Sequence, residues 1–306
     1  MATISGIGLN GLGLNLASGV SSASGEPSVL AQAYGAWSTL DVFGTGGNVI
    51  RLRDASASPT ERDFTATELT DGTYDSWAVS GEGSVFVTDV YDQSGSFTVS
   101  NGSSTSQPKY ISSDNSILFD RTAPFSSPRR LLSANSDQIN TDFGGNTIGD
   151  GVTFASSLRA SSHSRTTKEA IFGVRDNAPA SDLGDRHKFL IMNHTNDYIG
   201  VSSRDSSYTL FDSVSTDALS SSIYKNYVGV IFRNPVQPTT TTEFDLFVDG
   251  SQEIDTNTDT LSDACQVKYF NWGGGIYKSY LALAFDKILD ASEVSTLNSE
   301  IGALSL

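Results

Sequence analysis

Carboxylates are numerous in this sequence and could carry out acid–base or nucleophilic chemistry, with 35 Asp and Glu in all. Two of them held about 5–10 Å apart, with the pKa of one raised, would suit the hydrolysis of a glycosidic bond. The candidates are Asp89, Asp92, Asp120, Asp245 and Asp249. Acidic residues are so numerous that any fold would bring some of them together, and no pair can be assigned as nucleophile and acid. Asp92, which precedes Gln-Ser-Gly, is predicted to accept hydrogen bonds within its own turn.

Each candidate site for a metal, a phosphate or a nucleophile lacks a necessary residue. The segment 255–259, Asp-Thr-Asn-Thr-Asp, has the alternating oxygen donors of a calcium loop. Thr260 and Gln266, however, stand where that loop needs Gly and Glu, so a polar hairpin is predicted instead. The histidines lack zinc-binding spacing, no glycine cluster is directly followed by Lys-Ser or Lys-Thr, and Gly-x-Ser-x-Gly is absent from the sequence. We therefore expect no metal and no cofactor.

Trp272 and Tyr277 flank three consecutive glycines and are candidates for glycan binding. Aromatic faces on loops suit sugar rings, so the pair could form a surface on which a glycan stacks. The alternative is that both rings pack into the core beside the last helix, because aromatic side chains contribute mainly through burial.

The composition is that of a folded protein with an acidic surface. The 306 residues are 38% hydrophobic and include 16 Phe and 11 Tyr, which is enough for the core of one large β domain or two smaller ones. Lys and Arg number 19 against 35 Asp and Glu, a formal charge of −16 that repels nucleic-acid phosphate and anionic lipid. We therefore expect neither nucleic acid nor membrane as a partner.

Cysteine usage and the N-terminal residues bear on the cellular setting. The single cysteine, Cys265, rules out an intrachain disulfide and is expected to be a small buried residue rather than a reactive thiol. No apolar run approaches the roughly 18 residues of a membrane helix. The N-terminus lacks Lys and Arg, and Gly and Asn interrupt its apolar residues, so we expect no secretory signal.

Residues 1–25 form a segment unlike the rest, in which Gly-Ile-Gly-Leu-Asn is followed by Gly-Leu-Gly-Leu-Asn. Glycine at this density disfavours a helix, yet the segment is too aliphatic for a solvated tail. Its regularly placed aliphatic residues are Ile7, Leu9, Leu12, Leu14 and Leu16. We predict an extended arm that docks in a groove on another subunit, where backbone hydrogen bonds and apolar pockets offset the cost of ordering. The alternative is an arm that folds back on its own domain.

Residues 26–306 are predicted to form one β-sandwich. Val85, Val87 and Asp89 would share one face of a strand over 84–90, with Phe86, Thr88 and Val90 on the other. Further strands are predicted at 48–53, 152–158, 169–174, 188–192, 198–201, 227–232, 243–248 and 279–285, with a strand or loop at 61–69. Asp249-Gly250 is typical of a hairpin turn.

Three helical segments are predicted around these strands. Apolar residues at three- and four-residue spacing between Pro27 and Leu40 favour an amphipathic helix, with Pro27 in its first turn. Residues 74–79 favour a single helical turn. Near the end, Asp290 and Glu293 have the spacing of a capping box before a helix whose apolar face contains Val294, Leu297 and Ile301.

Five short motifs together resemble a known family. They are Ala33-Tyr34, 49–53 (Val-Ile-Arg-Leu-Arg), 87–95 (Val-Thr-Asp-Val-Tyr-Asp-Gln-Ser-Gly), Gln107-Pro108 and 118–120 (Leu-Phe-Asp). Their order is similar to that of the concanavalin A-like module shared by the catalytic domain of fungal-type α-L-arabinofuranosidases and by many structural proteins of tailed bacteriophages. Val90 and Arg121 replace the Trp and Gly usual there. The resemblance covers about residues 28–132 and implies a jelly-roll sandwich.

The resemblance implies a virion protein that decorates the capsid or belongs to the tail or fibre. Its partners would be other capsid or tail subunits, including copies of itself, and its lectin-like sandwich would bind a host or environmental glycan. The alternative function is a glycoside hydrolase of arabinofuranosidase type. We expect no enzymatic activity, because the catalytic pair of that family cannot be recognised in residues 133–260.

Overall fold

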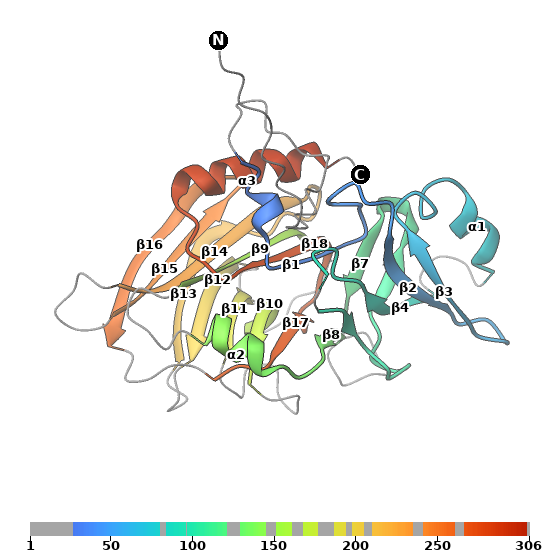
Figure 1. The fold of residues 1–306 in the computed structure, drawn as a ribbon, viewed down its shortest axis with the longest axis horizontal. Helices are drawn as coiled ribbons and strands as arrows, with labels where there is room; N and C mark the ends of the chain where they lie inside the picture. Colours follow the sequence, from blue (N-terminus) through green and yellow to red (C-terminus); the bar gives the residue numbers. More distant parts are fainter. Residues whose placement is uncertain are drawn as a thin grey trace, which may run out of the picture.

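Two antiparallel β-sheets pack face to face in the computed structural model, with short helices around them (Figure 1). The structure describes residues 27–79, 84–95, 97–120, 129–144, 151–160, 168–176, 187–193, 198–204, 210–234, 241–260 and 266–304. The helices are η1 (Leu30–Gln32), α1 (Thr73–Trp77), η2 (Ser112–Asp114), α2 (Asp137–Phe143) and α3 (Ala291–Ala303). Within the described ranges, no helix has the length and apolar character needed to cross a membrane.

The first sheet runs in the order β16–β15–β14–β9–β18, and β1 and β7 share the remaining edge of β18. Its strands are β1 (Gly35–Ser38), β7 (Ser116–Phe119), β9 (Gly151–Ala160), β14 (Lys225–Asn234), β15 (Thr241–Val248), β16 (Ser251–Thr260) and β18 (Tyr277–Phe285). The second sheet runs in the order β13–β12–β11–β10–β17–β8–β5. Its strands are β5 (Val99–Ser100), β8 (Arg130–Ser133), β10 (Lys168–Arg175), β11 (His187–Asn193), β12 (Tyr198–Arg204), β13 (Leu210–Ala218) and β17 (Tyr269–Gly273).

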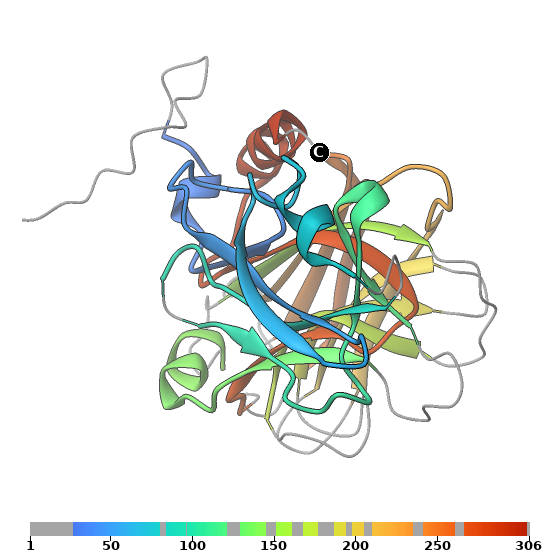
Figure 2. The ribbon, with the colours of Figure 1, turned by 90° about the vertical axis from the view of Figure 1, so that its right-hand side faces the viewer.

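A side sheet joins the two main sheets at one end of the sandwich. It contains β2 (Asn48–Asp54), β3 (Thr60–Thr65), β4 (Val85–Val90) and β6 (Lys109–Ile111). The start of β4 pairs with β6, which leads through β7 to the first sheet, and the end of β4 pairs with β5 in the second. Figure 2 looks onto this end, where the blue strands β2 and β3 lie in front of the sandwich.

The main core lies between the two sheets. One buried cluster contains Phe154 and Leu246 of the first sheet together with Leu190 and Val201 of the second. A Cβ added at Gly229 would lie 2.4 Å from the Val201 side chain and 2.6 Å from that of Leu190, so the sheets approach too closely there for any other residue.

Helix α3 and η1 cover the outer face of the first sheet. Val294, Leu297 and Ile301 of the helix belong to a second buried cluster with Val228 and Phe247 of the sheet. Asp290 accepts hydrogen bonds from the backbone N–H groups of Ser292 and Glu293, and the Glu293 carboxylate accepts from that of Asp290. The predicted capping box and the predicted apolar face are therefore both confirmed.

The predicted strands all appear in the structure, so the predicted fold class, an all-β sandwich with a few short helices, is confirmed. Asp249 and Gly250 have φ of 50° and 83° and form the two-residue turn between β15 and β16. The segment 255–259 lies within β16 of the same hairpin, and the single helical turn predicted at 74–79 is α1.

The predicted helix from Pro27 to Leu40 is wrong. Only Leu30–Gln32 is helical, as one 3-10 turn, and Gly35–Ser38 is strand β1, paired with β18. All four residues of β1 are buried, so apolar residues occur on both faces and imitate a helical spacing. A Cβ added at Gly35 would lie 2.3 Å from the Trp37 indole, which explains why glycine begins this strand.

The predicted alternation of β4 is also partly wrong. Arg51 pairs with Asp89 and Leu52 with Val87, so Thr88 is an additional residue on β4. This bulge places Val90 on the same buried side as Val85 and Val87, and all three are fully buried in the main core.

Candidate functional site

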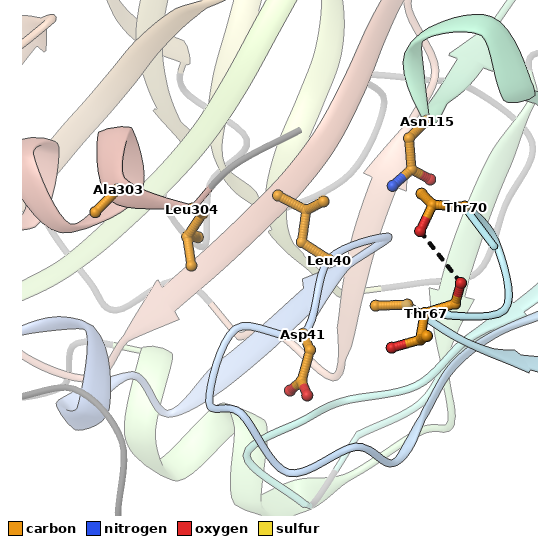
Figure 3. A pocket seen from close by; sticks show the side chains of 8 residues that line it. Leu40, Asp41, Thr67, Thr70, Asn115, Ala303 and Leu304 are labelled. Atoms are coloured by element: carbon orange, nitrogen blue, oxygen red, sulfur yellow. Dashed lines mark hydrogen bonds between the residues drawn. The ribbon is translucent and has the colours of Figure 1, made fainter.

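A cleft of about 480 Å³ lies where the side sheet meets the first sheet and the end of α3. Residues from four separate segments line it: Leu40, Asp41, Ala66, Thr67, Thr70, Asn115, Ala303 and Leu304. Figure 3 shows Leu40 near the middle, with Asp41 and Asn115 on opposite sides of it. The cleft combines a carboxylate, an amide and two hydroxyl groups with aliphatic side chains, which is the usual make-up of a small-molecule site.

The turn after β4 holds the loop that carries Leu40 and Asp41. Gln93 donates from Nε2 to the Leu40 carbonyl (2.7 Å) and accepts at Oε1 from the Val42 N–H (2.8 Å). The neighbouring Asp92 accepts from the Ala36 N–H of β1 (2.9 Å) and from the N–H of Ser94 within the turn (3.0 Å). The prediction that Asp92 caps its own turn is confirmed, and the turn also fixes one wall of the cleft.

Asp41 is oriented by its own loop. Its two carboxylate oxygens accept hydrogen bonds from the N–H groups of Thr45 (3.0 Å) and Gly46 (2.8 Å). Each oxygen of an ionised carboxylate has a second lone pair, so both can still accept a hydroxyl hydrogen from a ligand.

Asn115 ends η2 in the left-handed conformation, with φ of 46°, which asparagine tolerates better than most residues. Its Oδ1 accepts from the buried Tyr110 hydroxyl (2.8 Å), and its backbone carbonyl accepts from Thr39 Oγ1 (2.6 Å). The side chain is only 6% exposed, and no residue in the described ranges accepts from its Nδ2. The amide nitrogen carries two N–H groups and is the atom of this side chain that can donate to a ligand in the cleft.

The residue before Asn115 anchors η2 to the first sheet. Asp114 accepts hydrogen bonds from Lys278 of β18 (2.9 Å) and from Ser116, and it pairs with Arg159 of β9. Partial burial alone would raise the pKa of Asp114. The hydrogen bonds from Ser116 and Lys278 and the charges of Lys278 and Arg159 outweigh that effect, so its pKa is lowered.

Replacing Asp114 with asparagine should therefore weaken the fold in a pH-dependent way. A carboxylate whose pKa is lowered by folding stabilises the protein above its unfolded pKa of about 3.9, and the contribution is lost as pH falls through the folded value. We expect Asp114→Asn to lower the free energy of unfolding by about 2 kcal/mol at pH 7. Urea denaturation at several pH values should show the free energies of unfolding of the two proteins converging as the pH falls below the unfolded pKa of about 3.9. If the difference in free energy of unfolding between the two proteins does not shrink in acid, the Asp114 carboxylate does not stabilise the fold through its charge.

Trp272 and Tyr277 do not form an exposed sugar-stacking surface. Both are fully buried in the main core, where the Phe119 ring lies 5.6 Å from the Trp272 ring and 5.0 Å from that of Tyr277. The Tyr277 hydroxyl donates to the Ile171 carbonyl at 2.7 Å. This corrects the expectation of a glycan platform here and agrees with the alternative of core packing.

Several other candidates have structural roles or lie outside the described residues. Asp120 pairs with Arg129 and Lys109, and Asp89 accepts from Ser100. Among the residues that the structure describes, no three of His, Cys, Asp and Glu lie close enough together to hold a metal ion. Two candidate groups fall outside these residues: Cys265 and the arm residues Ile7, Leu9, Leu12, Leu14 and Leu16.

The sequence reasoning did not identify the residues of the cleft. Asp41 stands in Asp-Val-Phe-Gly-Thr-Gly-Gly, directly after the segment predicted as a helix, and Asn115 follows Ser-Ser-Asp. The glycines after Asp41 and the Asp-Asn pair were the available signals, because both are typical of loops that carry polar groups.

The sequence matches no family model and no curated protein. The structure is similar to that of an α-L-arabinofuranosidase soaked with a cyclic sulfate inhibitor, with a TM-score of 0.58 and 10% identity over 91% of this chain and 63% of that one. An arabinofuranosidase complexed with arabinofuranosyl-α-1,2-xylobiose has a TM-score of 0.56 and 10% identity, over 91% of this chain and 63% of that one. The binding domain of botulinum neurotoxin serotype G has a TM-score of 0.50 and 12% identity, over 84% of this chain and 52% of that one.

This chain thus spans between half and two thirds of the length of those structures. At such low identity the similarity establishes the fold alone: the chain is a β-sandwich protein with a lectin-like jelly-roll architecture.

Proposed function

We propose that this protein is a structural component of a bacteriophage particle, on the capsid or in the tail or fibre apparatus, and that its sandwich binds a glycan. The cleft between the side sheet and α3 is the observation that carries the glycan-binding part. The virion part rests on the resemblance of five sequence motifs to those of phage structural proteins and on the predicted aliphatic arm.

The cleft has the chemistry that a saccharide needs. Sugar hydroxyl groups both donate and accept, so a carboxylate acceptor at Asp41 and an amide donor at Asn115 would bind different hydroxyls of one ligand. Leu40 and Leu304 supply aliphatic surface for the C–H face of the ring. The polar groups are already oriented by protein hydrogen bonds, which lowers the cost of binding.

The predicted arm leads into a firmly held part of the sandwich. The first described residue, Pro27, precedes η1, whose Leu30 N–H donates to the buried Glu300 carboxylate of α3 (2.7 Å). Lys287 links Gln32 of η1 to Glu293 of α3, with 2.7 Å to each. An arm docked on a neighbouring subunit would therefore be joined to a rigid point of its own domain, as an assembly contact requires.

Two experiments test the two parts of the proposal separately. Deletion of residues 2–20 should abolish incorporation into phage particles while the purified protein keeps its β-sheet circular dichroism. Particles that still incorporate the truncated chain would contradict the docking arm.

On a glycan array, the intact protein should bind a subset of saccharides, and Asp41→Ala should lose about tenfold or more in affinity, because a charge-assisted hydrogen bond contributes about 1.5–3 kcal/mol. An array without any binding would contradict the glycan-binding part.

The alternative, a glycosidase of arabinofuranosidase type, finds less support at this cleft. Hydrolysis by the retaining or inverting mechanism uses two carboxylates, and Asp41 is the single acid among the described residues that line the cleft. Turnover of an aryl arabinofuranoside by the purified protein, abolished in Asp41→Asn, would favour the enzyme instead.

A further inference from the structure

We infer that the cleft selects neutral, hydroxyl-rich saccharides and rejects acidic ones, and that Asp41 determines this preference. The inference rests on the proposed glycan binding and names the class of ligand. It follows from the charges around the cleft and from the placement of its donor and acceptors.

The charged side chain that lines the cleft is unfavourable to an anion. Asp41 is the one charged residue among the described residues that line the cleft, and no Lys, Arg or His occurs among them. A sugar carboxylate would need a cation or several N–H donors in place of its water shell. At this site it would lie near the Asp41 carboxylate instead, and the repulsion between the two negative charges costs free energy even when water lies between them.

The end of α3 adds to the same effect. Ala303 is the last residue of the helix and lines the cleft together with Leu304. The carbonyl groups at a helix C-terminus carry a partial negative charge, and the last turn of α3 contains no basic side chain to offset it. The formal charge of the whole chain, −16, has the same sign.

Hydroxyl groups, in contrast, match the atoms that the cleft presents. The Asp41 oxygens keep free lone pairs after binding the Thr45 and Gly46 N–H groups, so they accept from hydroxyl donors. Thr70 Oγ1 donates its hydrogen to the Thr67 carbonyl (3.2 Å), and so it too presents lone pairs to a ligand. Asn115 Nδ2 supplies a donor on the other side of Leu40 (Figure 3). Three acceptors and one donor suit a diol-bearing neutral ring better than a carboxylate, which can only accept.

The test uses the intact protein and pairs of saccharides that differ by one terminal acidic sugar. An array carries each oligosaccharide with and without a terminal sialic acid, and isothermal titration then compares one bound neutral glycan with its sialylated form. We expect the neutral member to bind about tenfold more tightly, the factor that corresponds to a repulsion of about 1.4 kcal/mol. In Asp41→Asn the ratio of the two affinities should fall towards unity, because the charge is lost while the amide oxygen keeps one of the two hydrogen bonds to the loop.

Two control variants separate charge at the site from other effects. Asp286→Asn removes the same charge from an exposed position outside the cleft and should leave the ratio unchanged. Asn115→Gly keeps the left-handed backbone but removes the donor, so it should weaken neutral and acidic members alike. Equal or tighter binding of sialylated glycans by the unmodified protein would overturn the inference and leave the proposed glycan binding intact. Absence of binding to every glycan would overturn both.

Discussion

Replacement of Asp92 by alanine should lower the free energy of unfolding by about 3–4 kcal/mol, because it leaves one buried and two partly buried N–H groups without their acceptor. Its carboxylate accepts from the N–H groups of Ala36 (2.9 Å), Ser94 (3.0 Å) and Phe97 (2.9 Å), and it is only 9% exposed. These bonds connect β1 to the turn after β4. Urea denaturation followed by circular dichroism at pH 7 measures the loss as a lower midpoint.

Two variants serve as controls for this prediction. Asp92→Asn keeps one acceptor oxygen and should lose roughly half as much stability as the alanine variant. Asp286→Ala removes an exposed carboxylate and should change the free energy of unfolding by about 0.5 kcal/mol or less. If Asp92→Ala loses no more stability than Asp286→Ala, the hydrogen bonds of Asp92 do not stabilise the fold as argued. Since Gln93 holds the Leu40 loop from the same turn, Asp92→Ala should also weaken glycan binding at the cleft.

The hairpin turn and the start of the last helix were predictable because short-range patterns determine them. The hairpin turn at Asp249-Gly250 needs positive φ at both residues, and asparagine, aspartate and glycine are the residues that adopt it most readily. The capping box at Asp290 and Glu293 is equally local, because donor and acceptor lie three residues apart. In both cases a few adjacent residues contain all the necessary information.

The region from Pro27 to Leu40 shows where local patterns fail. Its apolar spacing is compatible with a helix, but β1 is stabilised by pairing with β18, almost 250 residues later in the chain. Trp37 lies 4.9 Å from Phe270 and 5.4 Å from Phe172, measured between ring centroids, and these partners come from two other strands. The burial of both faces of β1 is therefore a property of the tertiary structure that the segment alone does not encode.

The cleft was unpredictable for the same reason. Asp41 and Asn115 are 74 residues apart, and Leu304 lies at the far end of the sequence. Only the pairing of β1 and β7 with the same edge of β18 brings the first two segments together. Asp and Asn in loops are so common that neither residue distinguishes a ligand site from an ordinary turn until the fold is known. Aromatic residues beside a triple glycine are equally ambiguous from sequence, and here Trp272 and Tyr277 belong to the core.

Replacement of Trp272 by alanine should therefore destabilise the protein by about 3–5 kcal/mol and leave its glycan preferences unchanged. The side chain is fully buried beside Phe119, so the substitution creates a cavity between the sheets rather than removing a binding surface. Among the described residues none accepts from the Trp272 Nε1, so Trp272→Phe removes an unsatisfied donor along with some volume and should cost about 1 kcal/mol or less. Urea denaturation measures the loss of stability, and the glycan array measures the glycan preferences at a temperature where both variants are folded. An alanine variant with near-normal stability that no longer binds any glycan would contradict the burial of this ring and restore it as a sugar platform.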